Sequence, residues 1–224
     1  YTVGRQLVET IQAHLPLSDA QARERAIGLL RSTGIPAPET RIDHYPHQFS
    51  GGMRQRVVIA LALAIDPKLV VADEPTTALD VSIQAQIIAL LKSLCRDHGT
   101  AVMLVTHDMG VIAETADRVA VMYAGRIVEI GPVAQVIHAP RHPYTVGLMG
   151  SIPSIADERE QLAQIEGAMP RLNAIPAGCA FNPRCPQALP ICRERRPELV
   201  TSDAAQRTGV ACWLHASQVA EPAQ

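Results

Sequence analysis

Two short apolar runs, separated by a helical pattern, limit most strongly what this chain can fold into. Leu69 to Ala72 and Ala101 to Val105 are apolar and rich in β-branched side chains, as expected of strands buried in a parallel sheet. Between them, Asp80 is a suitable N-cap, Gly99 is a suitable stop, and apolar residues recur at helical spacing. The order strand, helix, strand predicts an α/β fold with a parallel-sheet core.

Two more helices are expected before this core. Ser18 and Gln21 match a capping box at the start of a helix that Gly34 and Pro36 end. A second helix should begin near Ser50 and continue through the apolar stretch to Ile65. The region from residue 1 to about 65 is therefore predicted to be mainly helical.

The part after the core is expected to be of two kinds. Arg118 to Tyr123 and Arg126 to Ile130 should pair as an antiparallel hairpin. Beyond about residue 148, prolines and cysteines become frequent and the expected elements become short. We therefore predict one domain over residues 1–148, with its core region at about 66–130, and a small Cys- and Pro-rich tail domain over residues 149–224.

Composition narrows the classes of function. Aromatic residues make up only 3% of the chain and the net charge is −2, which argues against a stacking platform or a basic field for nucleic acid. The longest apolar run, Val57 to Ile65, is much shorter than the roughly 20 residues of a bilayer span. No charged and apolar leader follows Tyr1. These features predict a cytoplasmic polypeptide that does not cross a membrane and is incomplete at its start.

Two carboxylates follow the first apolar run directly. Strand ends in open α/β sheets line the ligand crevice, so Asp73 and Glu74 are expected at such an edge. Asp73 is a candidate ligand for Mg²⁺, which favours oxygen donors. Glu74 is a candidate for orienting and polarising an attacking water in phosphoryl transfer. The alternative is that both are solvated acids before the turn at Pro75.

A glycine-rich helix start and a histidine complete the candidate site. Ser50, Gly51 and Gly52 begin the expected second helix, whose free N–H groups and positive dipole end suit a phosphate. His107 follows the second apolar run at the same predicted sheet edge as Glu74, where it can sense or donate to a phosphate oxygen. Each feature alone also has a purely structural explanation, as a helix cap and as a buried histidine.

Taken together, these motifs resemble those of the ABC-transporter ATPases. The run Ser50 to Arg56, SGGMRQR, is similar to the signature motif of that family, and Asp73-Glu74 after an apolar strand is similar to its Walker B motif. Thr77-Ala78-Leu79-Asp80 resembles the D-loop, and His107 resembles the switch histidine. The order and spacing of the motifs also fit the family.

The resemblance implies a fold, cofactors and roles for these residues. The fold is the C-terminal part of an ABC-type P-loop NTPase domain, with a helical subdomain and a parallel-sheet core, followed by the tail. The cofactors are ATP and Mg²⁺, with Asp73 at the metal and Glu74 and His107 as catalytic residues. ATP in this family is held between two subunits. The residues implied in nucleotide binding are Ser50, Gly51, Gly52, Met53 and Asp80.

The tail narrows the resemblance to the ATPases of oligopeptide and dipeptide importers. The likeness lies in His142 to Thr145, in Ser151 to Pro153 and in Gly178 to Pro186, with Cys192 following. Related importers of nickel and glutathione share this tail, so the cargo stays open. The resemblance implies an ATP-hydrolysing subunit that energises peptide import at the cytoplasmic face of the inner membrane.

The same resemblance implies partners. They are a second ABC ATPase, expected to be a paralogue, and two membrane-spanning permease subunits on which residues 1 to 65 would dock. An external substrate-binding protein would take part indirectly, and no nucleic acid is expected. A signature-bearing ATPase of the chromosome or DNA-repair class is disfavoured, because those proteins lack the tail that begins at His142.

The phosphate-binding loop of the family, Gly-x-x-x-x-Gly-Lys-Ser/Thr, does not occur in the sequence. Tyr1 to Gly4 resembles the segment that follows the family's Q-loop. We therefore expect a C-terminal fragment that does not hydrolyse ATP alone and that is marginally stable, because apolar sheet edges are exposed. A non-catalytic remnant, or a metal-binding tail module that depends on a partner ATPase, remains an alternative.

Four of the five cysteines crowd into the last fifth of the chain. In a reducing compartment such a cluster indicates a metal more often than disulfides. Four thiolates can bind Zn²⁺ or a [4Fe–4S] cluster, and some members of the resembled family carry such a cluster on tail cysteines. We favour iron–sulfur over zinc, and free thiols or disulfides remain open. The candidate ligands are Cys179, Cys185, Cys192 and Cys212.

Overall fold

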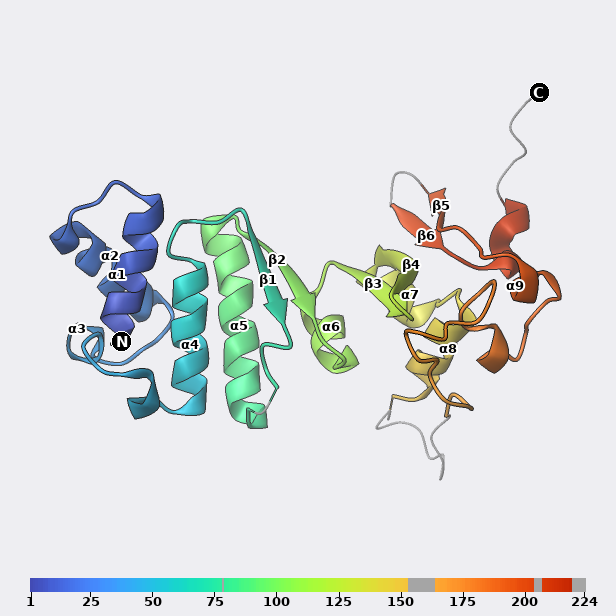
Figure 1. The fold of residues 1–224 in the computed structure, drawn as a ribbon, viewed down its shortest axis with the longest axis horizontal. Coiled ribbons are helices and arrows are strands. Elements are labelled where there is room, and N and C mark those ends of the chain that lie inside the picture. Colours follow the sequence, from blue (N-terminus) through green and yellow to red (C-terminus); the bar gives the residue numbers. More distant parts are fainter. Residues whose placement is uncertain (78, 153–163, 204–206, 219–224) are drawn as a thin grey trace. The chain divides into compact units, whose positions relative to one another are not determined.

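The computed structural model describes residues 1–77, 79–152, 164–203 and 207–218 of the 224-residue chain. These residues belong to two compact units, Tyr1–Asp108 and Met109–Gln224, and each is described by itself (Figure 1). The division predicted from the sequence, at residue 148, is not tested by this and stays a prediction. Residue 78 and residues 153–163, which include predicted motif positions in the D-loop and at Pro153, lie outside the described residues.

The first unit begins with a helical layer. Helices α1, α2 and α4 pack on one another around buried apolar side chains that include Leu7, Ile11 and Leu30. The capping box at the start of α2 is confirmed, because Ser18 accepts the N–H of Gln21 and Gln21 bonds back to the Ser18 N–H. The elements of the layer are α1 (Val3–His14), α2 (Asp19–Ser32), α3 (Pro38–Arg41), the 3₁₀ turn η1 (Pro46–Gln48) and α4 (Gly51–Ala62).

A strand, helix, strand unit follows the helical layer. β1 (Leu69–Asp73) pairs in parallel with β2 (Ala101–Val105), and the register places Asp73 opposite Val105 at the end of both strands. The connecting helix α5 (Val81–His98) lies between α4 and the two strands in Figure 1. It starts at the Asp80 cap and ends at Gly99, which adopts the left-handed conformation at φ +64°. The predicted parallel α/β core is confirmed.

The prediction that both strands are buried is wrong in one respect. One face of the pair is open, with Leu69, Val71 and Met103 each more than half exposed and Val105 44% exposed. The alternating pattern along each strand gives the physical reason, because only every second side chain points toward the covered face. The exposed face stays apolar.

The second unit contains an antiparallel sheet with short helices. β3 and β4 form the predicted hairpin around Ala124 and Gly125, which have φ values of +47° and +78°. The sheet order is β3-β4-β6-β5. The elements are α6 (Met109–Thr115), β3 (Arg118–Tyr123), β4 (Arg126–Pro132), α7 (Val133–His138), α8 (Pro143–Gly150), η2 (Asn182–Arg184), α9 (Ile191–Glu194), β5 (Val200–Asp203), β6 (Thr208–Val210) and η3 (Trp213–Gln218).

Aromatic rings form the centre of the second unit. The Tyr123 ring lies 4.7 Å from the Tyr144 ring and 5.2 Å from the Phe181 ring, between centroids, in tilted and edge-on arrangements. Arg184 donates to the Tyr123 hydroxyl and to the backbone carbonyls of Ile165 and Glu166. These contacts fasten the segment after residue 164 onto β3. No helix within the described ranges is long and apolar enough to cross a membrane.

Candidate functional site

Glu74 occupies a strained turn directly after β1. Its φ of +44° lies in the left-handed region, which is uncommon for a residue with a side chain. The Glu74 N–H donates to the Val105 carbonyl at 2.8 Å. This bond joins the turn to the end of β2 and fixes where the Glu74 side chain starts.

The Glu74 carboxylate is held by two side chains. Oε2 accepts the Thr77 hydroxyl at 2.8 Å, and Oε1 lies 3.0 Å from His107 Nδ1. The Thr77 hydrogen bond, followed by the bond to His107, holds the pKa of Glu74 below its usual value. The carboxylate therefore stays ionised at neutral pH, and as a charged acceptor it can orient a water molecule. The sheet-edge argument predicted that Glu74 and His107 lie together, and the structure brings them into contact.

The start of α4 lies against α5 and the segment before it. Ser50 caps α4 by accepting the Met53 N–H at 3.3 Å. A Cβ at Gly51 would lie 3.7 Å from Leu79, and one at Gly52 would lie 2.7 Å from the Ile83 side chain. Gly52 is therefore required here by close packing, in addition to any approach of a ligand.

Asp80 and Gln84 shape the segment between Glu74 and α5. Asp80 accepts the Ile83 N–H at 3.0 Å and the Ser82 hydroxyl at 2.8 Å. The Ile83 bond is the main reason that the pKa of Asp80 is lowered. Gln84 Nε2 donates to the carbonyls of Thr76 and Leu79 at 3.2 and 3.3 Å. Sequence reasoning missed Gln84, because no local motif marks a side-chain amide that bonds to backbone preceding its own helix.

Asp73 lies next to the site but faces a different environment. It ends β1 and lines an apolar cavity of about 140 Å³ between α4 and the strands, together with Gln55 and Val70. Its side chain is exposed, so an oxygen donor is available at the strand end where a hard cation would bind. The role of Asp73 at Mg²⁺ stays a prediction.

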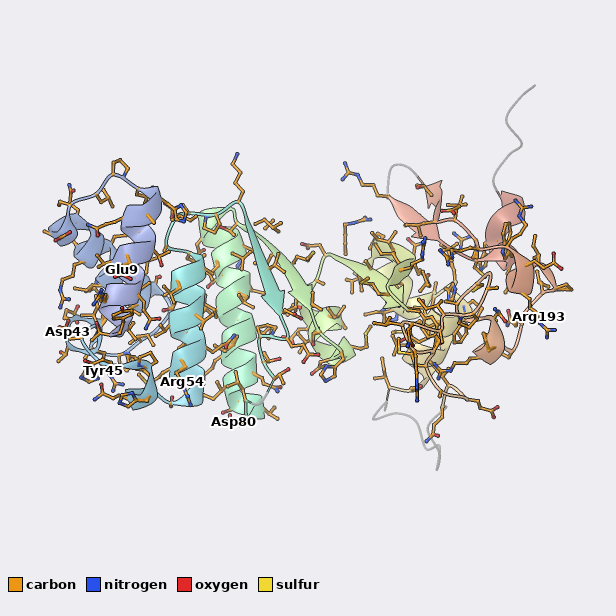
Figure 2. The ribbon with its side chains drawn as sticks, in the orientation of Figure 1. Glu9, Asp43, Tyr45, Arg54, Asp80 and Arg193 are labelled. Atoms are coloured by element: carbon orange, nitrogen blue, oxygen red, sulfur yellow. The ribbon has the colours of Figure 1, made fainter. Side chains whose placement is uncertain are left out.

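Arg56 links three helices around the glycine-rich helix start. Its guanidinium donates to the Thr33 carbonyl at the end of α2 at 2.6 Å and to Gln86 on α5 at 2.9 Å. Gly34 makes room for it, because a Cβ there would lie 2.6 Å from Arg56 Nη1. Figure 2 shows Arg54, on the same helix, and Asp80 at the same end of the paired helices α4 and α5. Arg56 belongs to the signature-like run, but its bridging contacts were not foreseen.

The four tail cysteines line one small cavity in the second unit. Cys179 and Cys192 come together because the Cys179 N–H donates to the Cys192 carbonyl at 2.8 Å, and Gly178 permits this approach. Burial raises the pKa of Cys179 and Cys185, and raises that of Cys212 to about 11, so these thiols stay protonated at neutral pH. The buried ring of His142 lines the same cavity.

The expected metal site is not formed by the cysteines as they are placed. Within the described ranges, no group of three or more Cys, His, Asp or Glu side chains is arranged to hold a metal ion. The cavity measures only about 10 Å³, which is close to the space needed for one water molecule. Four thiols therefore converge, but they leave no room for an iron–sulfur cluster.

Comparison with known proteins places these motifs in a family. The family model for the ABC transporter matches residues 2–77, and the model for the oligopeptide/dipeptide transporter C-terminal region matches residues 128–192. The chain belongs to the ABC transporter family. The first match includes the helix start at Ser50 and the acids Asp73 and Glu74, and the second includes three of the four tail cysteines.

Curated relatives agree with both family matches. The chain is 51% identical over 199 residues to the dipeptide transport ATP-binding protein DppD of Escherichia coli, which covers 89% of this chain and 61% of that protein. It is 46% identical over 220 residues to the oligopeptide transport ATP-binding protein AppD of Bacillus subtilis, covering 98% of this chain and 66% of the relative. The chain therefore spans a little under two thirds of the length of these relatives.

Solved structures support the fold. The dimeric structure of MJ0796, a bacterial ABC transporter cassette, matches with a TM-score of 0.52 and 32% identity, over 59% of this chain and 57% of that one. An inward-facing metal-chelate type ABC transporter matches with a TM-score of 0.57 over 66% of this chain and 57% of that one. That second likeness, at 21% identity, shows the fold alone.

Proposed function

We propose that this chain carries part of the ATP-hydrolysing site of a subunit that energises peptide import. The observation that carries the proposal is the Glu74 carboxylate, held between Thr77 and His107 at the end of a parallel strand pair. The relatives named as dipeptide and oligopeptide transport ATP-binding proteins support peptides as the cargo. Whether the cargo is a dipeptide or a longer peptide is a matter for the transport assay.

The chain's residues divide the proposed reaction between them. Glu74 orients and polarises the attacking water, and His107 holds the Glu74 carboxylate and meets a phosphate oxygen. Mg²⁺ neutralises the phosphate charge when ATP is bound, and Asp73 offers an oxygen donor for it at the strand end. The oxygen-rich donor set at this edge fits a hard cation.

The start of α4 supplies the second half of the proposed nucleotide site. Ser50, Gly51 and Gly52 lead into a 12-residue helix whose first N–H groups point out of the helix end. In the proposal these groups, with Met53, face a nucleotide held by a second ATPase subunit. Asp80 caps α5 beside them and fixes the segment that lies at the same interface.

The proposed partners follow from this arrangement. A second ATPase subunit, a paralogue in our proposal, completes each nucleotide site. Two membrane-spanning permease subunits receive the helical layer of residues 1–65, and an external binding protein delivers peptide to them. The chain then works as a peripheral subunit at the cytoplasmic face of the inner membrane.

We also propose that Cys179, Cys185, Cys192 and Cys212 bind a metal centre after the cavity opens. Their convergence on one cavity supports this. Protonated thiols must lose their protons on binding, so loading should release protons and should be favoured by higher pH. Metal analysis and visible absorption of anaerobically purified chain distinguish iron–sulfur from zinc, and metal-free chain after reconstitution with either would contradict the proposal.

A chimera tests the main proposal directly. The matched segment of this chain replaces the corresponding segment of Escherichia coli DppD, and dipeptide uptake is measured in cells that lack DppD. We expect uptake to be restored by the chimera and abolished by its Glu74→Gln variant. Equal uptake by the two proteins would contradict the role of Glu74. Failure of a well-folded chimera to restore any uptake would instead favour the non-catalytic alternative.

A further inference from the structure

A second cavity in the second unit is used by none of the roles above. It has a volume of about 260 Å³ and lies beside the turn between β3 and β4. Its floor consists of buried side chains, Tyr123, Val128, Phe181 and Ala211. The volume lies just below the range of about 300–1,000 Å³ that holds drug-sized ligands. The cavity therefore suits a small molecule with an apolar body.

The rim of this cavity carries unpaired charges. Arg126, Arg196 and Glu198 line it and are exposed. In the part of the chain that the structure describes, none of the three side chains takes part in a hydrogen bond or an ion pair. Two guanidinium groups and one carboxylate give the rim a net charge of +1 (+2 − 1). Such a rim favours a carboxylate, which guanidinium groups bind through paired hydrogen bonds, and it offers a place for one ammonium group.

We propose that this cavity binds a short peptide with free termini, held by its carboxylate on Arg126 and Arg196 and by its ammonium group on Glu198. An apolar side chain of the peptide packs on Phe181 and Tyr123. The limited volume selects a dipeptide over a longer chain. The choice of a peptide among amphipathic carboxylates rests on the proposed import function.

Binding of three leucine peptides to the 224-residue chain tests the proposal. The probes are Leu-Leu, N-acetyl-Leu-Leu, which keeps only the carboxylate, and Leu-Leu amide, which keeps only the ammonium group. Titration calorimetry measures their affinities. We expect Leu-Leu to bind saturably, N-acetyl-Leu-Leu to bind several-fold more weakly, and the amide to bind weakest because the net positive rim selects the carboxylate.

Variants of the rim make the test specific. R126Q combined with R196Q should weaken Leu-Leu binding by roughly tenfold, since hydrogen bonds between charged groups are the stronger ones. E198Q should weaken binding of Leu-Leu but leave N-acetyl-Leu-Leu unchanged. R193Q is the matched control, because Arg193 is an exposed arginine of the same segment that does not line the cavity (Figure 2). Circular dichroism checks that each variant is folded.

The outcomes separate this site from the proposed transport function. Absence of saturable Leu-Leu binding, or equal affinity of the rim variants and R193Q, would overturn the site. Binding of N-acetyl-Leu-Leu without binding of Leu-Leu would overturn the peptide assignment. No nucleotide or transport step enters the measurement, so failure of the proposed import function would leave a positive result standing.

Discussion

Single residues fix the geometry of the candidate ATPase site through their backbone as much as through their side chains. Glu74 adopts a φ of +44°, a conformation that costs on the order of 1–3 kcal/mol and persists only where its surroundings hold it. The hydrogen bond from its N–H to Val105 supplies that restraint. Because His107 follows Val105 by two residues, the same bond sets the distance between the two side chains.

His142 should make the second unit sensitive to acid. Burial, with a smaller contribution from His215, lowers the pKa of His142 from 6.5 to about 4. The unfolded chain then binds a proton that the folded chain excludes, so stability is present above pH 6.5 and is lost as the pH falls toward 4. We expect about 2 kcal/mol of this loss between pH 7 and pH 5.

Replacing the ring tests this expectation by urea unfolding at both pH values. Asn at position 142 can still accept the Tyr144 N–H, as the His142 Nδ1 does at 3.1 Å, but it does not titrate. His142→Asn should therefore lose the pH dependence. His138→Asn, at an exposed histidine, should keep it. Parallel pH profiles for the two variants would show that His142 titrates normally in the folded chain.

Gly52 should not tolerate a side chain. A Cβ there would lie 2.7 Å from the Ile83 side chain, so Gly52→Ala forces α4 away from α5 and should cost roughly 1–3 kcal/mol of unfolding free energy. Gly28→Ala is the control, because Gly28 lies within α2 and nothing approaches its missing Cβ within 4 Å. That variant should gain up to about 1 kcal/mol from helix propensity. Equal stability of the two variants would contradict the packing account.

At the scale of helices and strands, local signals were predictable from the sequence and pairing over long distances was not. The caps Ser18 and Asp80 and the stop at Gly99 act through bonds within a few residues, so their patterns gave correct helix ends. β6 is specified by its pairing with β4, about 80 residues earlier. No periodic pattern marks so short a strand, and sequence reasoning missed it together with β5.

The same distinction applies to the candidate site. Glu74 and His107 were placed together because parallel strands end at one sheet edge. Thr77 was recognised only as part of a motif, and its bond to Glu74 depends on the strained turn between them. The cysteines converge as expected, yet their cavity is too small for the predicted cluster, which depends on side-chain packing that spacing does not reveal.

The Asp80 cap should contribute measurably to α5. Replacing it by Ala removes the acceptor for the Ile83 N–H and should cost about 1 kcal/mol in urea unfolding. Asn supplies an equivalent oxygen, so Asp80→Asn should retain most of that stability. A loss as large for Asn as for Ala would mean that the charge, and not the cap, stabilises the helix.

The exposed face of β1 and β2 should make the chain self-associate. Leu69, Val71, Met103 and Val105 present an apolar surface with unpaired strand edges beside it. Light scattering should show a mass that rises with concentration, and Val71→Thr combined with Met103→Thr should reduce this rise. Val81→Thr, at an exposed residue off this face, should not. A monomer at all concentrations, with a sharp cooperative melt, would contradict the expectation.

At the scale of the whole molecule, the two units carry different parts of the account. The first unit, Tyr1–Asp108, holds every residue assigned to ATP and Mg²⁺, and the second, Met109–Gln224, holds the cysteines and the proposed peptide cavity. The phosphate-binding loop of the family does not occur among the 224 residues. We therefore expect the purified chain by itself to hydrolyse no ATP, and the acids after β1 to act only on nucleotide that other residues help to hold.

The rate of ATP hydrolysis by the chimera with Escherichia coli DppD, compared with its Glu74→Gln variant, tests the central claim most directly. Removing a base that orients the attacking water should lower the rate by about 10²–10⁴-fold, while nucleotide affinity changes little because Gln keeps the shape of the side chain. A matched Asp108→Asn variant should keep most of the rate. Turnover by Glu74→Gln within about twofold of the unaltered chimera would contradict the assignment of Glu74 as the residue that activates water.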